Sequence, residues 1–235
     1  MSAASGPPEG VHTYTTLEEV PTDLQKYWLQ RNNIFSKYDE GIWLTDDAWF
    51  GVTPEPIAKK IAEHVATAPK EKKILIDAFA GAGGNVIAFA LSGRWSQIFA
   101  VEKDAKTLAC AKHNAEVYAV AKKIWWIHGD IFDVLKARLK ASVKNAVIFA
   151  SPPWGGPSYT DWDVFDLSYM EPYNLKVLYD AFSAANEVVL YLPRTSDVQQ
   201  LAKYAKGDEK LPVTHYCMKG ASKALCVFYG SFQVS

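Results

Sequence analysis

Three acidic side chains follow short apolar runs in the sequence. Asp77 ends "KILID", Glu102 ends "QIFAVE" and Asp130 ends "KIWWIHGD". The first two enclose the glycine turn "AFAGAGGN", which lets a ligand approach the backbone closely. A carboxylate beside this turn repels a pyrophosphate and attracts a cation, and Glu102 can accept both hydroxyls of a ribose. These requirements fit S-adenosylmethionine better than a nicotinamide dinucleotide, which stays the alternative because such enzymes also use glycine turns.

A second group lies in the loop "SPPWGG", residues 151–156, directly after the apolar run "NAVIFA". Prolines restrict this backbone and glycines leave space beside it, so Trp154 is held where a flat ligand can stack. A polar residue before Pro-Pro-aromatic resembles the signature of methyltransferases that act on exocyclic amines of nucleobases and on glutamine amides, where Asn or Asp is usual. Ser151 and the Pro152 carbonyl can accept the amine hydrogens, so catalysis would rest mostly on positioning. The alternative is a tight loop around a core tryptophan.

Apolar runs that alternate with helical patterns position both groups. Strands are expected within 73–80, 97–102, 123–130, 145–150, 187–193, 211–218 and 223–230. Helices are expected within 85–93, 104–120, 131–141, 172–184 and 196–205. This alternation predicts a mostly parallel α/β sheet of seven strands with helices on both faces, and the short connection before the last strand predicts one antiparallel strand. Ligands of such sheets bind beyond the carboxyl ends of the strands, where these polar residues lie.

The region before the first strand has a different character. Residues 1–20 are rich in small, polar, Pro and Gly residues and are expected to be a disordered tail. Aromatic and basic residues alternate after it, which favours a helical lid over residues 21–66; the alternative is an ordinary packing helix. Within it, "TPEPIAKKIAEHVA" predicts a helix with Thr53 at the N-cap. A methyltransferase domain is then expected over 67–235, and loss of residues 1–20 should be tolerated whereas loss of 1–40 should not.

Composition excludes several other classes of protein. The 235 residues have a formal net charge of −1, so an anionic ligand would have to meet a local basic patch. Cys110, Cys217 and Cys226 lie too far apart for a zinc site or a disulfide framework, which predicts a reducing compartment and no metal. The sequence shows no signal peptide and no apolar run of membrane length. We therefore expect a soluble, intracellular protein with no membrane partner.

Seven segments occur together in the order found in the trimethylguanosine synthase family of RNA cap methyltransferases. They are "YWLQRNNIFSKYDEGIWL", "WFGVTPEPIA", "DAFAGAGGNVIAFA", "HNAEVYAV", "GDIF", "SPPWGGPSY" and "YLPR", from about residue 24 to the C-terminus. The resemblance implies a Rossmann-like class I S-adenosylmethionine-dependent methyltransferase that adds two methyl groups to the 2-amino group of a 7-methylguanosine cap and releases S-adenosyl-L-homocysteine. It further implies capped small nuclear and small nucleolar RNAs (snRNA, snoRNA) as substrates. It also implies a monomer that interacts with snRNP and snoRNP proteins in the nucleus or nucleolus.

The resemblance also implies site residues by their positions. Catalysis would involve Ser151, Pro152 and Trp154, and cap binding would involve Trp154, Lys26, Phe35, Tyr159 and Arg194. S-adenosylmethionine would be held by Thr53, Asp77, Phe79, Gly81, Asn85, Glu102 and Asp130, with Glu102 where relatives commonly have Asp. Because a 7-methylguanine ring is cationic, stacking on Trp154 would gain about 0.5 to 2 kcal/mol over unmethylated guanine. Two alternatives stay open: an amine methyltransferase for another nucleobase, and a catalytically silent cap-binding module.

Overall fold

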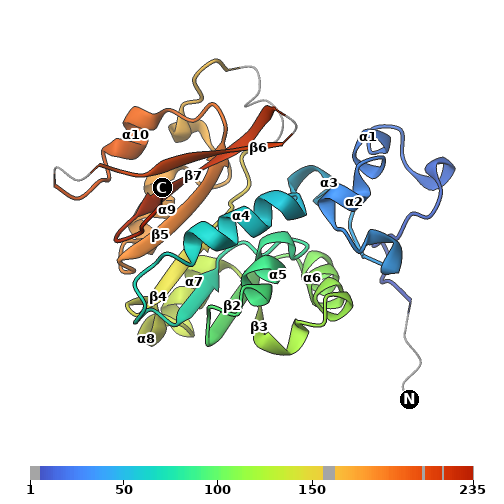
Figure 1. The fold of residues 1–235 in the computed structure, drawn as a ribbon, viewed down its shortest axis with the longest axis horizontal. Coiled ribbons are helices and arrows are strands. Elements are labelled where there is room, and N and C mark those ends of the chain that lie inside the picture. The colour runs from blue at the N-terminus through green and yellow to red at the C-terminus, as the bar shows by residue number, and fades with distance from the viewer. Residues whose placement is uncertain (1–5, 156–161, 208–209, 219, 235) are drawn as a thin grey trace.

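Seven strands form one sheet at the centre of the protein (Figure 1). The computed structural model describes residues 6–155, 162–207, 210–218 and 220–234. The strands are β1 Ile74–Asp77, β2 Gln97–Glu102, β3 Ile124–His128, β4 Ala146–Ala150, β5 Glu187–Pro193, β6 Val213–Met218 and β7 Ala221–Tyr229, in the order β3-β2-β1-β4-β5-β7-β6. Strands β1 to β5 pair in parallel, and β7 runs antiparallel between β5 and β6. The predicted α/β sheet of seven mostly parallel strands with one antiparallel strand is confirmed.

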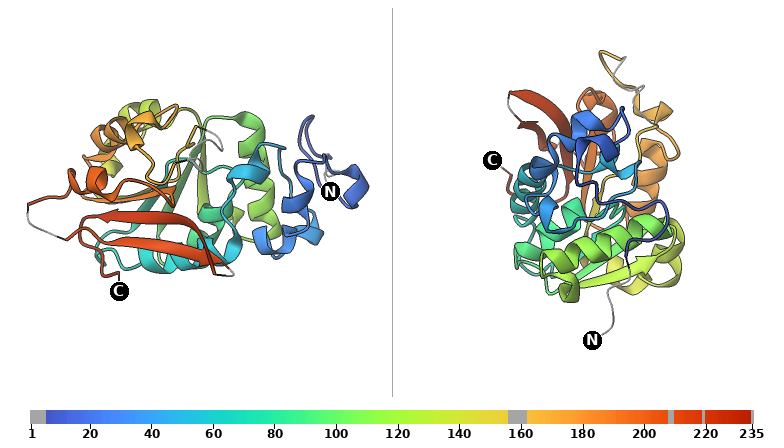
Figure 2. Two further views of the ribbon diagram at one scale, coloured as in Figure 1. Left: turned by 90° about the horizontal axis from the view of Figure 1, so that it is seen from above. Right: turned by 90° about the vertical axis from the view of Figure 1, so that its right-hand side faces the viewer.

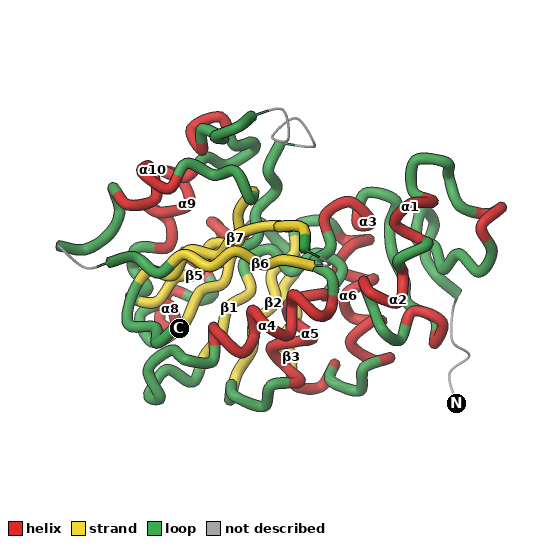
Figure 3. The backbone as a smooth tube through the Cα atoms, turned by 45° about the horizontal axis from the view of Figure 1, so that its top comes forward, coloured by secondary structure: helices red, strands yellow, loops and turns green. Residues whose placement is uncertain are grey.

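Helices cover both faces of the sheet, and each face has its own apolar core (Figure 3). One face carries α4 Glu55–Val65, α5 Gly84–Leu91 and α6 Ala105–Val117. The other carries α7 Ile131–Ala137, α8 Lys140–Val143, α9 Leu175–Phe182 and α10 Val198–Ala202. Phe149 belongs to the first core and Ile148 to the second, because successive side chains of a strand point to opposite faces. All five residues of β4 are buried, as is typical of a central parallel strand.

The strand order reverses between β1 and β4, which lie side by side. Asp77 pairs with Ala100 of β2 on one side and with Phe149 of β4 on the other. The loops that follow β1 and β4, the glycine turn and the SPPWGG loop, therefore start next to each other at one edge of the sheet. Open parallel sheets bind their ligands at this kind of position.

Residues 11–52, which we call the N-terminal segment, lie at one end of the molecule, blue in Figures 1 and 2. They contain the short helices η1 Leu17–Glu19, α1 Gln25–Trp28, α2 Arg31–Ile34, η2 Tyr38–Glu40 and α3 Ala48–Gly51. Helix α4, predicted above as part of the lid, packs along α5 and belongs to the helical layer on the sheet. Its N-cap is Pro54, so the prediction of Thr53 at that position is wrong.

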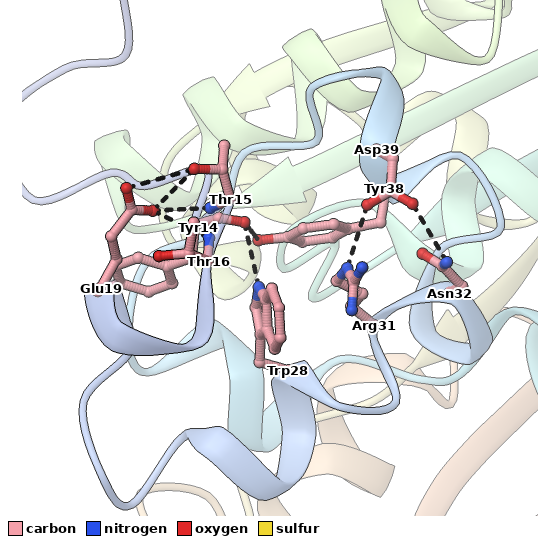
Figure 4. Close-up of polar contacts among 9 residues, drawn as sticks. All are labelled: Tyr14, Thr15, Thr16, Glu19, Trp28, Arg31, Asn32, Tyr38 and Asp39. Atoms are coloured by element: carbon pink, nitrogen blue, oxygen red, sulfur yellow. Dashed lines mark hydrogen bonds and ion pairs between the residues drawn. The ribbon is translucent and has the colours of Figure 1, made fainter.

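The expectation of a disordered tail over residues 1–20 is wrong for its second half. Val11, Tyr14 and Val20 are buried. Figure 4 shows that the Tyr14 carbonyl accepts hydrogen bonds from Trp28 Nε1 and from the Tyr38 hydroxyl, each of 3.1 Å. The anchoring side chains are few and are separated by polar residues, so the composition of this stretch conceals them. Removal of residues 1–20 would take part of the core of the N-terminal segment with it.

Candidate functional site

Asp77 ends β1 and is fully buried. Neither carboxylate oxygen has a hydrogen-bond partner of normal geometry within the described residues. Burial raises the pKa of Asp77 to about 8; the backbone N–H of Phe79 opposes this in part, and the Glu102 carboxylate adds to it. An ionised carboxylate in such surroundings needs a cation beside it. Asp77 is therefore a buried acid that is mostly protonated at neutral pH in the free protein, and an ammonium group of a ligand is the kind of partner that would stabilise its ionised form.

The glycine turn after β1 is open on one side. Gly81 and Gly83 have φ values of 53° and 99°, a backbone region that favours glycine. A Cβ atom at Gly81 would meet no other atom within 4 Å, so space lies beside it. Glu102 links the turn to the start of α6: its Oε2 accepts from the Gly81 N–H at 2.9 Å, and its Oε1 accepts from the Asp104 N–H at 2.9 Å. Each of these oxygens keeps a second acceptor position that can receive a ribose hydroxyl.

The start of α5 packs against Val52 and Thr53, where the N-terminal segment ends and the chain leads into α4. Thr53 is buried, and its hydroxyl accepts a hydrogen bond of 2.9 Å from Asn85 Nδ2. A Cβ atom on Gly84 would lie 3.0 Å from the Thr53 carbonyl oxygen, so a side chain there would push the two elements apart. Asn85 Oδ1 is buried without a partner in the described part of the chain. The structure thus brings Thr53 and Asn85 together beside the glycine turn and leaves one amide oxygen unused.

Asp130 follows β3 and is held in place by several donors. Its Oδ1 accepts from the Phe132 N–H at 3.0 Å, at the start of α7, and its Oδ2 accepts from the Tyr173 hydroxyl at 2.9 Å and from Lys103 Nζ at 3.1 Å. Partial burial raises the pKa of Asp130, but these hydrogen bonds lower it overall. The Tyr173 ring lies 4.7 Å from that of Phe132 and 6.0 Å from that of Phe79. Phe79 and Asp130, both predicted to bind the cofactor, therefore share one aromatic neighbour, Tyr173.

The SPPWGG loop begins where β4 ends. Pro152 is buried, whereas Ser151 and Trp154 are half-buried. Trp154 contacts both apolar cores, and its Nε1 donates to the Tyr191 carbonyl of β5 at 3.3 Å. The indole is thus fixed through its edge while part of it stays exposed, which a stacking platform requires. Gly156, the last residue of the loop, lies outside the described residues.

The remaining residues predicted to bind a cap lie on other elements. Arg194 is exposed in the turn that follows β5, and β5 is the neighbour of β4 in the sheet. Lys26 is exposed on α1, and its ammonium nitrogen lies 4.9 Å from the centroid of the Tyr27 ring. Phe35 is buried, with an exposed fraction of 2%, so protein encloses its ring and its contact with a cap stays a prediction. Tyr159 lies outside the described residues.

Two residues of this region were missed in the sequence analysis, Tyr173 and Asn114. Tyr173 comes from the loop that follows β4, and nothing in its local sequence predicts its contact with Asp130. Asn114 is fully buried in α6 and binds the glycine turn through the Ala82 carbonyl. A signal for Asn114 was present, because it lies four residues after Cys110 on the apolar stripe of a predicted helix, and a buried amide there must find partners.

Two classes of site do not occur in the part of the chain that the structure describes. Among the described residues, no group of three or more His, Cys, Asp or Glu side chains is placed to hold a metal ion. No helix in the described ranges is long and apolar enough to cross a membrane.

Comparisons with known proteins agree with the site. The model of the family described as RNA cap guanine-N2 methyltransferase matches residues 72–232. A trimethylguanosine synthase of Schizosaccharomyces pombe is 39% identical over 212 residues, which cover 89% of this chain and 87% of that protein. The trimethylguanosine synthase of Saccharomyces cerevisiae is 36% identical over 183 residues, 77% of this chain and 58% of that protein.

A solved structure described as a putative methyltransferase from Porphyromonas gingivalis W83 has the same fold. It superposes with a TM-score of 0.66 at 15% identity, covering 93% of this chain and 55% of that one. The strand order, the glycine turn with its buried Asp77 and the family match over most of the chain lead to one assignment. The chain belongs to the RNA cap guanine-N2 methyltransferase family and is an S-adenosylmethionine-dependent methyltransferase of class I.

Proposed function

We propose that this protein transfers two methyl groups in succession to the 2-amino group of a 7-methylguanosine cap, forming a 2,2,7-trimethylguanosine cap. Family membership and the two relatives named trimethylguanosine synthase support the reaction. The observation that carries the proposal is the position of the SPPWGG loop. It begins on β4 next to the end of β1, where Asp77 lies buried and unsatisfied within the described residues.

The residues around the glycine turn fit S-adenosylmethionine. Bound there, this molecule supplies a methyl group on a positively charged sulfur. The buried Asp77 carboxylate would accept its ammonium group, Glu102 its ribose hydroxyls, and the space beside Gly81 would let it lie against the backbone. Phe79 and Asp130, joined through Tyr173, would line the base end of the site.

The chain contributes to the reaction by orienting the amine. The lone pair of a guanine 2-amino group is delocalised into the ring, so the nitrogen is a poor nucleophile until its hydrogens are held by acceptors. Ser151 Oγ and the Pro152 carbonyl are the proposed acceptors, and both follow directly from the end of β4. Because β4 is buried over its whole length, these acceptors are attached to a rigid element. Such positioning lowers the barrier by replacing a random encounter with a held geometry.

Selection of the cap would rest on Trp154. Its indole is held at its edge by the bond from Nε1 to the Tyr191 carbonyl, and part of the side chain stays exposed. A cationic 7-methylguanine gains about 0.5 to 2 kcal/mol from such stacking, which favours caps that already carry the 7-methyl group. The exposed Lys26 and Arg194, together with Tyr159, are the proposed partners of the cap phosphates.

The RNA substrates and the place of action extend this proposal. We infer small nuclear and small nucleolar RNAs as the capped substrates, because the two relatives bear the name of the enzyme that makes this cap. The protein would then act as a monomer in the nucleus or nucleolus and meet the proteins of these ribonucleoproteins there.

Three RNAs of one sequence test the substrate: one with a 7-methylguanosine cap, one with an unmethylated cap and one without a cap. Each is incubated with the protein and S-adenosylmethionine labelled in its methyl group. We expect label only in the first RNA, or far faster there than in the second. Label in the uncapped RNA alone would contradict the proposal and favour an amine methyltransferase for an internal base.

A further inference from the structure

The motif "HNAEVYAV" is a feature of the sequence that the proposed function does not explain. It covers the last five residues of α6 and the three residues that follow, and His113 and Asn114 contact the N-terminal segment. His113 Nε2 donates to the Gly41 carbonyl at 2.8 Å, and the imidazole stacks on the Trp43 indole at 3.8 Å and 7°. The motif is therefore a docking face for the segment that carries Lys26.

Asn114 is the centre of this docking face. Its Oδ1 accepts from the Trp43 N–H at 2.8 Å, and its Nδ2 donates to the Trp43 carbonyl at 2.9 Å, so one amide binds both backbone groups of Trp43. The second hydrogen of Nδ2 is donated to the Ala82 carbonyl at 2.9 Å. The side chain is 0% exposed. Both donors of the amide are thus used, and they join two different parts of the protein.

Ala82 lies in the middle of the glycine turn. The Gly83 N–H, in the same peptide unit as the Ala82 carbonyl, donates to the Ala80 carbonyl at 3.0 Å. Asn114 therefore holds one end of this peptide plane while the turn itself holds the other. The glycines on either side have positive φ angles and leave the plane free to rotate when it is not held. The orientation of the turn that receives the cofactor depends on a side chain that also binds the N-terminal segment.

Tyr118, the C-cap residue of α6, makes a second contact with the N-terminal segment. Among the described residues, it has no polar contact with the glycine turn. The Tyr118 hydroxyl donates to Glu55 Oε2 and accepts from the Lys37 N–H at 3.3 Å, and Glu55 also accepts from the Ser36 N–H at 2.6 Å. Burial raises the pKa of Glu55, but hydrogen bonds from Lys59, Tyr118 and Ser36 lower it to about 2. Glu55 is therefore ionised at any working pH, and Tyr118 anchors residues 36–37 independently of Asn114.

We propose that Asn114 is a positioning residue that couples cap binding to cofactor binding, by linking the N-terminal segment to the glycine turn. The proposal rests on the proposed function in one respect, the contribution of the N-terminal segment to the cap site. A bound cofactor that fixes the conformation of the turn also fixes Ala82, Asn114 and Trp43. The N-terminal segment is then ordered before the cap binds. The two ligands then bind more tightly together than separately, and each must raise the affinity of the other by the same factor.

Amide hydrogen exchange of the unaltered protein tests this link without a substitution. Exchange is measured with and without S-adenosylhomocysteine, in peptides that cover the glycine turn and in peptides that cover residues 41–44. We expect slower exchange in both sets of peptides, because Asn114 joins residues 41–44 to the turn. Protection of the turn with unchanged exchange at 41–44 would overturn the coupling. Protection of neither would show that the cofactor does not use this turn, and so would overturn the cofactor site as well.

The affinity for a 7-methylguanosine cap analogue, with and without S-adenosylhomocysteine, then gives the size of the coupling. We expect a factor of about ten in the unaltered protein, within the usual range for coupled sites. Asn114→Asp keeps the shape of the side chain but replaces Nδ2 by an oxygen that faces both carbonyls, and the factor should fall towards one. Asn145→Asp, the same change at an exposed position, should leave the factor unchanged and serves as the control. A folded Asn114→Asp variant that keeps the full factor would limit Asn114 to a role in stability and overturn the proposal.

Discussion

Replacement of Asp77 by Asn should stabilise the protein in the absence of cofactor. The native carboxyl has a pKa of about 8, against an ordinary value of 3.8, because it is buried without a partner. The native state therefore binds its proton more tightly than the unfolded state, so the carboxyl costs little below about pH 4 and more as the pH rises towards 8. At pH 7 the cost is about 4 kcal/mol, and at pH 5 it is about 2 kcal/mol. Asn, which cannot ionise, avoids this cost.

Denaturant unfolding of the free protein at pH 5 and pH 7 measures the effect. We expect Asp77→Asn to raise the free energy of unfolding at both pH values, with the larger gain at pH 7. Asp133→Asn, at an exposed carboxylate on α7, is the matched control and should change little. A variant that is less stable than the unaltered protein at pH 7, or a gain that is the same at both pH values, would refute the assignment of Asp77 as a strained buried acid.

Asp77→Asn should also weaken the binding of S-adenosylmethionine, because the ionised Asp77 is the proposed partner of its ammonium group. Below pH 8 the free protein must release a proton before it can hold this cation, so the affinity for S-adenosylmethionine should rise nearly tenfold from pH 6 to pH 7. Isothermal titration should show this rise in the unaltered protein and a weaker, pH-independent affinity in Asp77→Asn. A silent cap-binding module would keep its affinity for a cap analogue in this variant and show no turnover before or after the change.

Three further predictions follow from other contacts. Gly84→Ala places a Cβ atom 3.0 Å from the Thr53 carbonyl oxygen and should lower the free energy of unfolding by about 1 to 3 kcal/mol in denaturant titration. An unchanged free energy of unfolding would mean that the backbone at Thr53 moves away from the new side chain without loss of stability. Deletion of residues 1–20 should lower the melting temperature and the affinity for a cap analogue, since the Tyr14 carbonyl that binds two side chains is lost; a truncated protein as stable as the full chain would contradict the packing described above. Trp154→Phe should reduce the preference for a 7-methylated over an unmethylated cap in competition binding, by less than the factor of about 2 to 30 that the whole cation–π term represents, because a phenyl ring keeps part of it. An equal preference in both proteins would exclude cation–π selection.

The sequence predicted the sheet and the polar ends of its strands well. Short apolar runs with helical patterns between them define a parallel sheet, and such a sheet carries the ends of its strands to one edge. Asp77, Glu102 and the SPPWGG loop could therefore be grouped before any coordinates, and the register between β1 and β4 places the first and last of these side by side.

The contacts that cross between distant parts of the chain could not be predicted in this way. Asn114 bonds to Trp43 across 71 positions, and Tyr173 bonds to Asp130 across 43 positions. Neither separation is set by a local period, so pattern and propensity carry no information about the partner. The packed residues 11–20 were missed for a related reason, because a short stretch with three buried side chains has the composition of a tail.

Mass analysis of a 7-methylguanosine cap analogue, after incubation with the protein and S-adenosylmethionine, shows whether the protein methylates the 2-amino group and how many methyl groups it adds. We expect two new species, heavier by one and by two methyl groups, with both groups on the 2-amino nitrogen when the product is fragmented. An analogue that gains no methyl group, although the protein binds S-adenosylmethionine, would contradict the proposed function.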